Sequence, residues 1–73
     1  MEFKFILKDI MQEKGISQTK LAVMSGLRQG QISEWLSGRS IPAYYNLKIL
    51  CKVLKVSGDE ILGLKDDFVN NKK

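Results

Sequence analysis

The side chains best suited to binding chemistry lie on one face of a helix predicted from about Arg28 to Ser37. Ile32, Trp35 and Leu36 follow one another at i, i+3 and i+4, so they share one side of that helix and are expected to point into a core. The opposite side carries small or planar polar residues, namely Gln29, Gly30, Ser33, Glu34 and Ser37. An ordinary surface helix more often carries long lysine and glutamate side chains. This polar face is therefore a candidate for close hydrogen bonding to another molecule.

The chemistry of this face suits the edges of base pairs. The backbone of a helix in the major groove must come close to the base edges, and the small residues Gly30 and Ser33 permit this. The helix must also offer hydrogen-bond donors and acceptors to the bases. The amide of Gln29 can bind adenine N6 and N7 together, a contact that contributes roughly 1–3 kcal/mol of discrimination. Glu34 can accept a hydrogen bond from cytosine N4, although phosphates would repel it. The alternative is an ordinary solvent-exposed helix whose surface is weakly polar.

The basic residues are concentrated in the middle of the chain. The net charge is +4 over 73 residues. Residues 14–55 hold seven lysines or arginines and a single glutamate, which gives +6, whereas residues 1–13 and residues 56–73 each sum to −1. A basic band of this kind is typical of proteins that bind polyanions. Charge alone leaves open the alternative of a solvated, lysine-rich surface.

Residues for catalysis are scarce. The sequence has no histidine, no glycine-rich phosphate loop and no cluster of metal-ligating residues. Asp66 and Asp67 are adjacent in a polar tail and make a poor acid–base pair. Cys51, the single cysteine, is expected on an apolar helix face as an inert core residue. We therefore predict a protein that is not an enzyme and that uses no cofactor, metal or small-molecule ligand.

Length and hydropathy limit the number of domains and the compartment. A chain of 73 residues suffices for one small domain. No apolar run approaches the roughly 20 residues of a transmembrane helix. The first residues mix acidic with apolar side chains, unlike a signal peptide, and a lone thiol suits a reducing environment. We expect a cytoplasmic protein that does not contact a membrane.

Apolar spacing and stop signals divide the first half of the chain into three helices. The first helix has its apolar face at Phe3, Ile6, Leu7, Ile10 and Met11. Gly15 is expected to end it, and Ser17 to cap a second helix that ends near Gly26. The helix with the polar face follows and is expected to end at Gly38.

Two shorter apolar patterns predict two more helices. Pro42 suits the first turn of a fourth helix, because proline is favoured there. The buried side of that helix is predicted at Leu47, Leu50, Cys51 and Leu54. Ser57 and Glu60 fit a capping box that opens a short fifth helix through Leu62. No segment alternates with period two, so we predict an all-α domain over residues 1–64, followed by a C-terminal tail over residues 65–73.

The spacing of residues 15–62 resembles that of a known family. The matching positions are Ser17-Gln18-x-x-Leu21-Ala22, Gly26 in the turn, Ile32-Ser33, Gly38, Pro42 and Leu54-x-Val56-Ser57. This pattern resembles the phage-repressor and Cro-like (XRE-type) helix-turn-helix family over about two thirds of the chain. The resemblance implies a five-helix, lambda-repressor-like fold with the helix-turn-helix at helices 2 and 3. It also implies a transcriptional regulator, expected to be a repressor, that binds double-stranded DNA.

The same resemblance assigns DNA contacts position by position. Positions that commonly face bases are matched by Gln29, Gly30, Ser33 and Glu34. Positions that contact phosphate are matched by Gln18, Arg28, Ser37, Arg39, Ser40 and Asn46. Gln18 also matches the residue that braces the first base-contacting side chain. Base contacts choose the sequence, whereas phosphate contacts fix the register and supply most of the affinity.

Four residues depart from the family pattern. Ser25 stands where the family is usually apolar, and Val23 and Met24 stand where it is commonly polar. Either the second helix is therefore expected to be slightly rotated, or these two apolar side chains are expected to cover another group. Arg28 replaces the frequent serine or threonine cap of the third helix, so we expect that helix N-terminus to rely on a DNA phosphate.

Apolar residues near the C-terminus exceed what a short fifth helix can bury. They are Ile61, Leu62, Leu64, Phe68 and Val69. We expect a dimerisation surface here, so that a homodimer binds a pseudo-palindromic operator with half-sites about one helical turn apart. The alternative is a tail docked on its own domain. Of Tyr44 and Tyr45, one is expected to pack beneath the start of the fourth helix, and the other to donate its hydroxyl to phosphate.

A second functional hypothesis is a protein-interaction module. In this case the chain is an antitoxin-like partner of another protein, and DNA binding is secondary. Val23, Met24, Phe68 and Val69 motivate the hypothesis because they are apolar residues without an obvious place in the core. A stable homodimer favours the regulator, and a monomer with an exposed apolar patch favours the interaction module.

Overall fold

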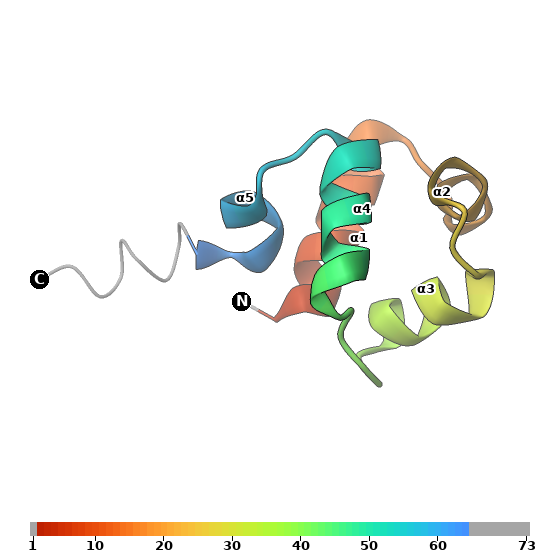
Figure 1. The fold of residues 1–73 in the computed structure, drawn as a ribbon, viewed down its shortest axis with the longest axis horizontal. Coiled ribbons are helices and arrows are strands. Elements are labelled where there is room, and N and C mark those ends of the chain that lie inside the picture. Colours follow the sequence, from red (N-terminus) through yellow and green to blue (C-terminus); the bar gives the residue numbers. More distant parts are fainter. Residues whose placement is uncertain (1, 65–73) are drawn as a thin grey trace, which may run out of the picture.

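The computed structural model describes residues 2–64 and folds them into five helices (Figure 1). They are α1 (Phe3–Lys14), α2 (Gln18–Ser25), α3 (Gln29–Ser37), α4 (Tyr44–Leu54) and α5 (Gly58–Leu62). No strand occurs among these residues, so the all-α prediction is confirmed. The predicted tail, with Phe68 and Val69, lies outside the described residues.

The helix boundaries predicted from glycines and caps are confirmed. The backbone is left-handed just after α1, α2 and α3, at Gly15, Gly26 and Gly38. At the start of α2, the Ser17 hydroxyl accepts a hydrogen bond from the backbone N–H of Lys20 at 3.1 Å. At the start of α5, Ser57 and Glu60 form the predicted capping box, because each side chain accepts from the other residue's backbone N–H. Short helices such as these depend on their ends being satisfied.

The end of α3 lies close to the start of α1. Gly38 has a φ of 86°, a conformation that favours glycine. A Cβ atom at this position would lie only 2.8 Å from Cδ of Lys4 in α1. The backbone conformation therefore favours glycine here, whereas the contact with Lys4 involves the end of a flexible side chain that can move away.

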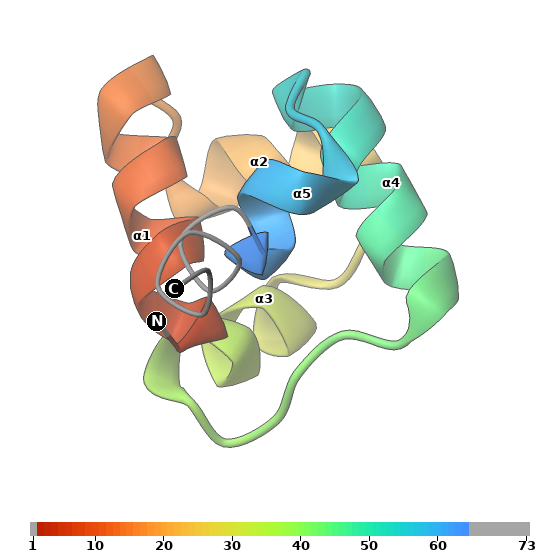
Figure 2. The same cartoon turned by 90° about the vertical axis from the view of Figure 1, so that its left-hand side faces the viewer.

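All five helices contribute to one hydrophobic core. Its buried residues are Ile6, Leu7, Ile10, Met11, Leu21, Ile32, Trp35, Leu50, Leu54 and Ile61. Helix α3 contacts both α1 and α2, and α5 contacts both α1 and α4. Figure 2 shows α5 between α1 and α4, with α3 crossing beneath them. Because α3 is packed from two sides, its orientation is set by the core.

The start of α4 differs from the prediction. Pro42 does not lie in the first helical turn, because α4 begins at Tyr44 with Ala43 as its N-cap. Pro42 is instead buried in the preceding connection, where its ring packs and its missing N–H costs no helical hydrogen bond. Tyr44 and Tyr45 are each 73% exposed, so the prediction that one of them packs beneath the helix was wrong.

The burial of several apolar residues also differs from the prediction. Ile61 is fully buried in the core, where α5 meets α1 and α4, so it cannot form part of a dimerisation surface on the folded chain. Leu62 and Leu64 remain about half exposed, as such a surface requires. Leu47 and Cys51 are only partly buried, because the outer side of α4 borders an open groove.

Candidate nucleic-acid interface

Helix α3 turns its polar face to solvent. Ile32 is fully buried and Trp35 is 3% exposed, so the inward direction predicted for both side chains is confirmed. The four predicted base-contacting residues, Gln29, Gly30, Ser33 and Glu34, are all exposed. The face is narrow, because no side chain on it except Gln29 and Glu34 extends beyond a hydroxymethyl group. It has the shape that a helix needs in order to enter the major groove.

The turn between α2 and α3 explains one departure from the family pattern. Gly26 follows α2 with a φ of 76° and lets the chain turn toward α3. The partly buried Ser25 hydroxyl accepts a hydrogen bond from the backbone N–H of Leu27 at 3.1 Å. Serine therefore has a structural role at this position, where it satisfies a turn N–H. Val23 is 79% exposed, so α2 is not rotated to bury it.

Two hydrogen bonds join the start of α2 to the start of α3. The Gln18 amide Nε2 donates to the backbone oxygen of Gln29 at 3.2 Å. The Gln29 amide Nε2 donates to the Thr19 hydroxyl at 2.9 Å. The family resemblance implies that Gln18 braces the Gln29 side chain, but Gln18 contacts the backbone oxygen of Gln29. The Gln29 side chain is instead bound by Thr19, a residue that the sequence pattern does not indicate.

Among the other predicted phosphate-contacting residues, the two arginines lie at the ends of α3 and the asparagine lies in α4. Arg28 is the N-cap of α3, and its side chain makes no cap hydrogen bond to the backbone N–H groups of the first helical turn. Arg39 is exposed just beyond the other end, and Asn46 is half-buried in the first turn of α4. Two arginines thus stand at opposite ends of the candidate base-contacting face.

A small polar cluster forms at the C-terminal end of α3. The Ser37 hydroxyl donates to the backbone oxygen of Glu34 at 3.0 Å, and the Ser40 hydroxyl donates to Oε1 of Glu34 at 3.4 Å. Both serines were predicted to contact phosphate, and each now uses its hydroxyl proton within the cluster. Glu34 is thereby held toward Ser40, at the edge of the face.

Within residues 2–64, no group of three histidine, cysteine, aspartate or glutamate side chains could hold a metal ion. No helix among the same residues is long and apolar enough to cross a membrane.

No charged or polar side chain in this part of the chain is buried, so the charges act at the surface. The interface is therefore built from exposed hydrogen-bonding groups and exposed arginines.

Comparison with known proteins agrees with this geometry. A family model described as helix-turn-helix matches residues 7–61. The chain is similar to the crystal structure of a tyrosine-to-phenylalanine mutant of the restriction-modification controller protein C.Esp1396I, with a TM-score of 0.78 and 25% sequence identity over 99% of this chain and 91% of that chain. The comparison with curated proteins found no match. The chain belongs to the phage-repressor and Cro-like (XRE-type) helix-turn-helix family of DNA-binding regulators.

Proposed function

We propose that this protein is a sequence-specific transcriptional regulator that represses by occupying an operator in double-stranded DNA. The observation that carries the proposal is the exposed, slim polar face of α3, whose opposite side is anchored in the core by Ile32 and Trp35. The name of the similar solved protein, a restriction-modification controller protein, supports a regulatory role. Repression is favoured over activation because a small domain bound across a promoter blocks it by occupancy alone.

The proposed contacts divide into two kinds. The exposed residues Gln29, Gly30, Ser33 and Glu34 are proposed to face the bases, and the Gln29 amide is proposed to bind an adenine. Arg28 and Arg39 lie at the two ends of that face and are proposed to bind phosphates on either side of the groove. Supporting phosphate contacts are proposed for Gln18, Ser37, Ser40 and Asn46. The two serine hydroxyls would have to release Glu34 in order to donate to phosphate.

The experiment that tests the proposal is a selection of binding sites from random duplex DNA at two salt concentrations. We expect a recovered consensus with two related halves. On that consensus, Gln29→Ala should relax discrimination at one base pair in each half by roughly 1–3 kcal/mol and leave binding to random duplex unchanged. Fluorescence anisotropy with duplexes that carry each base at each position measures the effect.

Arg39→Ala is the matched comparison on the phosphate side. It should weaken binding to all duplexes alike and lower the slope of log affinity against log salt by about one. The recovery of no consensus, or identical effects of Gln29→Ala and Arg39→Ala on every duplex, would show that the α3 face does not select sequence.

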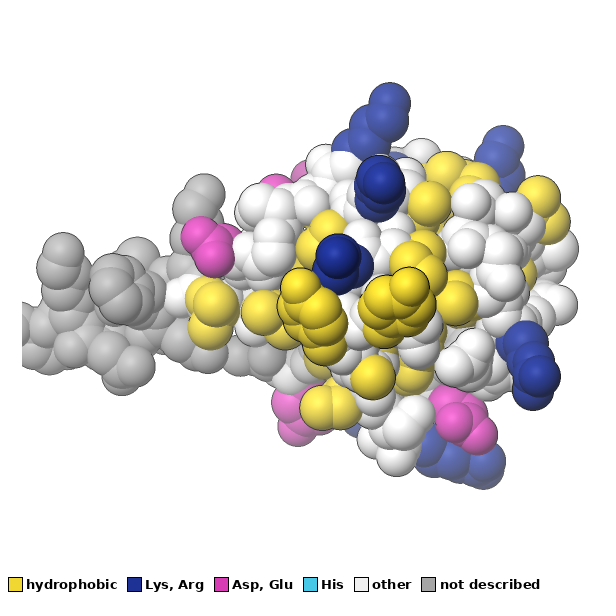
Figure 3. Space-filling model, viewed as in Figure 1, with side chains coloured by type: hydrophobic (Ala, Val, Ile, Leu, Met, Phe, Trp, Pro, Cys, Tyr) yellow, Lys and Arg dark blue, Asp and Glu magenta, His cyan; other side chains and the backbone are white. Residues whose placement is uncertain are grey.

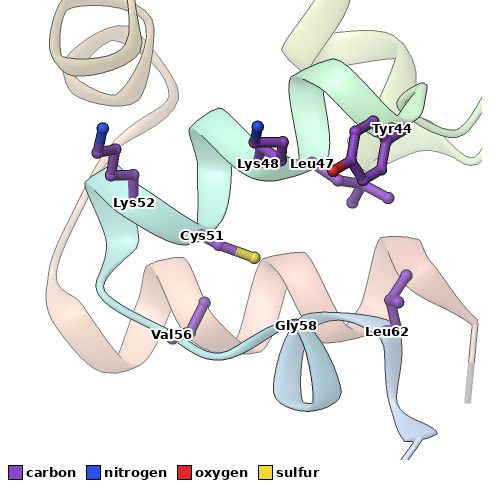
Figure 4. A pocket seen from close by; sticks show the side chains of 8 residues that line it. All are labelled: Tyr44, Leu47, Lys48, Cys51, Lys52, Val56, Gly58 and Leu62. Carbon is purple, nitrogen blue, oxygen red and sulfur yellow. The ribbon is translucent and has the colours of Figure 1, made fainter.

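We further propose that the regulator acts as a homodimer through the groove between α4 and α5. The groove has a volume of about 450 Å³. Tyr44, Leu47, Lys48, Cys51, Lys52, Val56, Gly58 and Leu62 line it (Figure 4). Figure 3 shows hydrophobic side chains gathered around lysines on this face of the molecule. Burial raises the pKa of the Cys51 thiol, so this side chain is uncharged at neutral pH and contributes a weakly polar surface to the groove.

Charge complementarity favours a second copy as the occupant of the groove. Lys48 and Lys52 lie on α4, and Asp59 is exposed on α5. In a two-fold dimer the same surface of both copies forms the interface. If α4 of one copy packs against α5 of the other, the lysines of one copy lie near the aspartate of the other. Such a dimer would also present two α3 helices to a pseudo-palindromic operator.

Leu62→Glu is expected to convert the dimer into a monomer. Leu62 is 45% exposed, so the change leaves the core intact but places a charge in the proposed apolar interface. Light scattering after size exclusion should give about twice 8.3 kDa for the wild type and 8.3 kDa for the variant. The control is Val23→Glu, the same charge at an apolar residue that is 79% exposed on α2, which should remain dimeric. A wild type that is monomeric at every concentration, on and off DNA, would contradict the proposal.

Two exposed apolar residues on α2 support a second candidate function, that of a protein-interaction module. Val23 is 79% exposed and Met24 is 40% exposed, and neither belongs to the proposed DNA or dimer surfaces. Phe68 and Val69, the other residues that motivate this candidate, lie outside the described residues. Under this candidate, the purified chain is a monomer that binds random and selected duplexes with equal affinity. The selection and scattering experiments above therefore decide between the two functions.

A further inference from the structure

The side chain of Gln29 is held in place before any DNA arrives. It belongs to the first residue of α3, and its Nε2 donates to the Thr19 hydroxyl in α2 at 2.9 Å. The preceding residue in α2, Gln18, holds the backbone oxygen of Gln29 at 3.2 Å. Consecutive residues of α2 therefore fix both the backbone and the side chain of the proposed adenine-contacting residue.

The anchoring α2 turn is itself well defined. The Ser17 hydroxyl caps α2 through the N–H of Lys20 at 3.1 Å, and Leu21, in the same turn, is fully buried. Thr19 is consequently carried on a backbone that cannot easily shift relative to α3. A long glutamine side chain loses rotamer freedom when it binds, and a side chain that is already restrained loses less.

The direction of this hydrogen bond decides which atoms of the Gln29 amide face outward. Because Nε2 uses one of its two protons on Thr19, the amide has one N–H and the Oε1 acceptor left to offer. One donor beside one acceptor is the complement of adenine, which presents the N7 acceptor and the N6 donor. Guanine presents two acceptors, O6 and N7, and would need two outward donors. The observed orientation therefore matches adenine and mismatches guanine.

We infer that Thr19 is a positioning residue that sets the base preference of this protein by holding the Gln29 amide in the orientation that binds adenine. This inference rests on the proposed function, because it presupposes that Gln29 contacts a base. Thr19 itself touches no base. It acts through Gln29, and its hydroxyl is the atom that matters.

The inference is tested with Thr19→Val, which keeps the shape of the side chain and removes the hydroxyl, and Thr19→Ser, which keeps the hydroxyl. Each is measured by fluorescence anisotropy on the selected operator and on operators with guanine in place of the adenine whose recognition depends on Gln29. Thr19→Val should reduce the preference for adenine over guanine about threefold to tenfold, the range of one net hydrogen bond. Thr19→Ser should retain the preference. In a Gln29→Ala background, Thr19→Val should have no further effect on it.

The outcomes separate the inference from the function on which it rests. If Gln29→Ala relaxes discrimination but Thr19→Val does not, the inference is wrong and the proposed function stands. If Thr19→Val weakens binding to every duplex alike, or acts equally with and without Gln29, Thr19 is a phosphate contact or a structural residue and the inference is overturned. If Gln29→Ala itself changes no base preference, the proposed role of Gln29 fails, and the role of Thr19 fails with it.

Discussion

Replacing Ser33 by glutamate should abolish high-affinity DNA binding and leave the fold unchanged. Ser33 is exposed in the middle of the α3 face, where a longer side chain would hold the helix away from the base edges. Its carboxylate would also face the phosphates on both sides of the groove, and like charges in an interface cost several kcal/mol. We expect affinity for the selected operator to fall roughly 100-fold or more, measured by fluorescence anisotropy.

Two control variants separate the shape and location of this residue from net charge. Gln12→Glu makes the same change of charge at an exposed residue of α1, outside the polar face of α3, and should reduce affinity only slightly, because exposed charges outside an interface are screened by salt. Ser33→Ala keeps the face slim and should retain most of the binding. Circular dichroism should show the same helix content and melting temperature in all three variants to within a few degrees. Equal losses for Ser33→Glu and Gln12→Glu would place the DNA surface elsewhere.

Much of the fold could be predicted from the sequence, because its signals are local. A glycine marks the end of each of α1, α2 and α3, and the spacing of Ile32 and Trp35 predicts which face of α3 points into the core. The capping box at Ser57 is equally local, since it depends on two residues three positions apart. Such signals require no knowledge of how helices cross.

The errors arose where the answer depends on how the helices pack. The short predicted fifth helix favours a dimer surface for Ile61, but α5 lies between α1 and α4, where Ile61 is fully buried. Pro42 fits a helix start by residue type, but it is buried in the connection before α4, which has Ala43 as its N-cap. The helices that surround Ile61 come from distant parts of the chain.

The site was predicted in outline but not in its hydrogen bonding. Exposure of Gln29 and Ser33 followed from helical periodicity. The contact between Gln29 and Thr19 joins residues ten positions apart on different helices, so it depends on the crossing of α2 and α3. Likewise, the bond from Ser40 to Glu34 depends on the path of the chain beyond α3. Sequence spacing alone could not reveal either pair.

Trp35→Ala should unfold a large part of the protein population at room temperature. Trp35 is 3% exposed in a core of ten buried residues, and truncating a buried tryptophan typically costs 3–5 kcal/mol, a value of about the whole stability of a small domain. Urea denaturation followed by circular dichroism measures the loss, since the variant has no tryptophan fluorescence. Trp35→Phe, which keeps an aromatic ring, should lose less than half as much. Tyr45→Ala, at a residue that is 73% exposed, should change stability little.

Trp35→Ala and Ser33→Glu should both lose DNA binding, but for different reasons that one experiment separates. An osmolyte that is excluded from protein surfaces, such as trimethylamine N-oxide, favours the folded state. It should restore helix content and operator affinity together in Trp35→Ala, because the α3 face is intact once the helix is packed. It should restore nothing in Ser33→Glu, which is already folded. Recovery of helix content in Trp35→Ala without recovery of affinity would mean that Trp35 contributes to DNA binding beyond holding α3 in place.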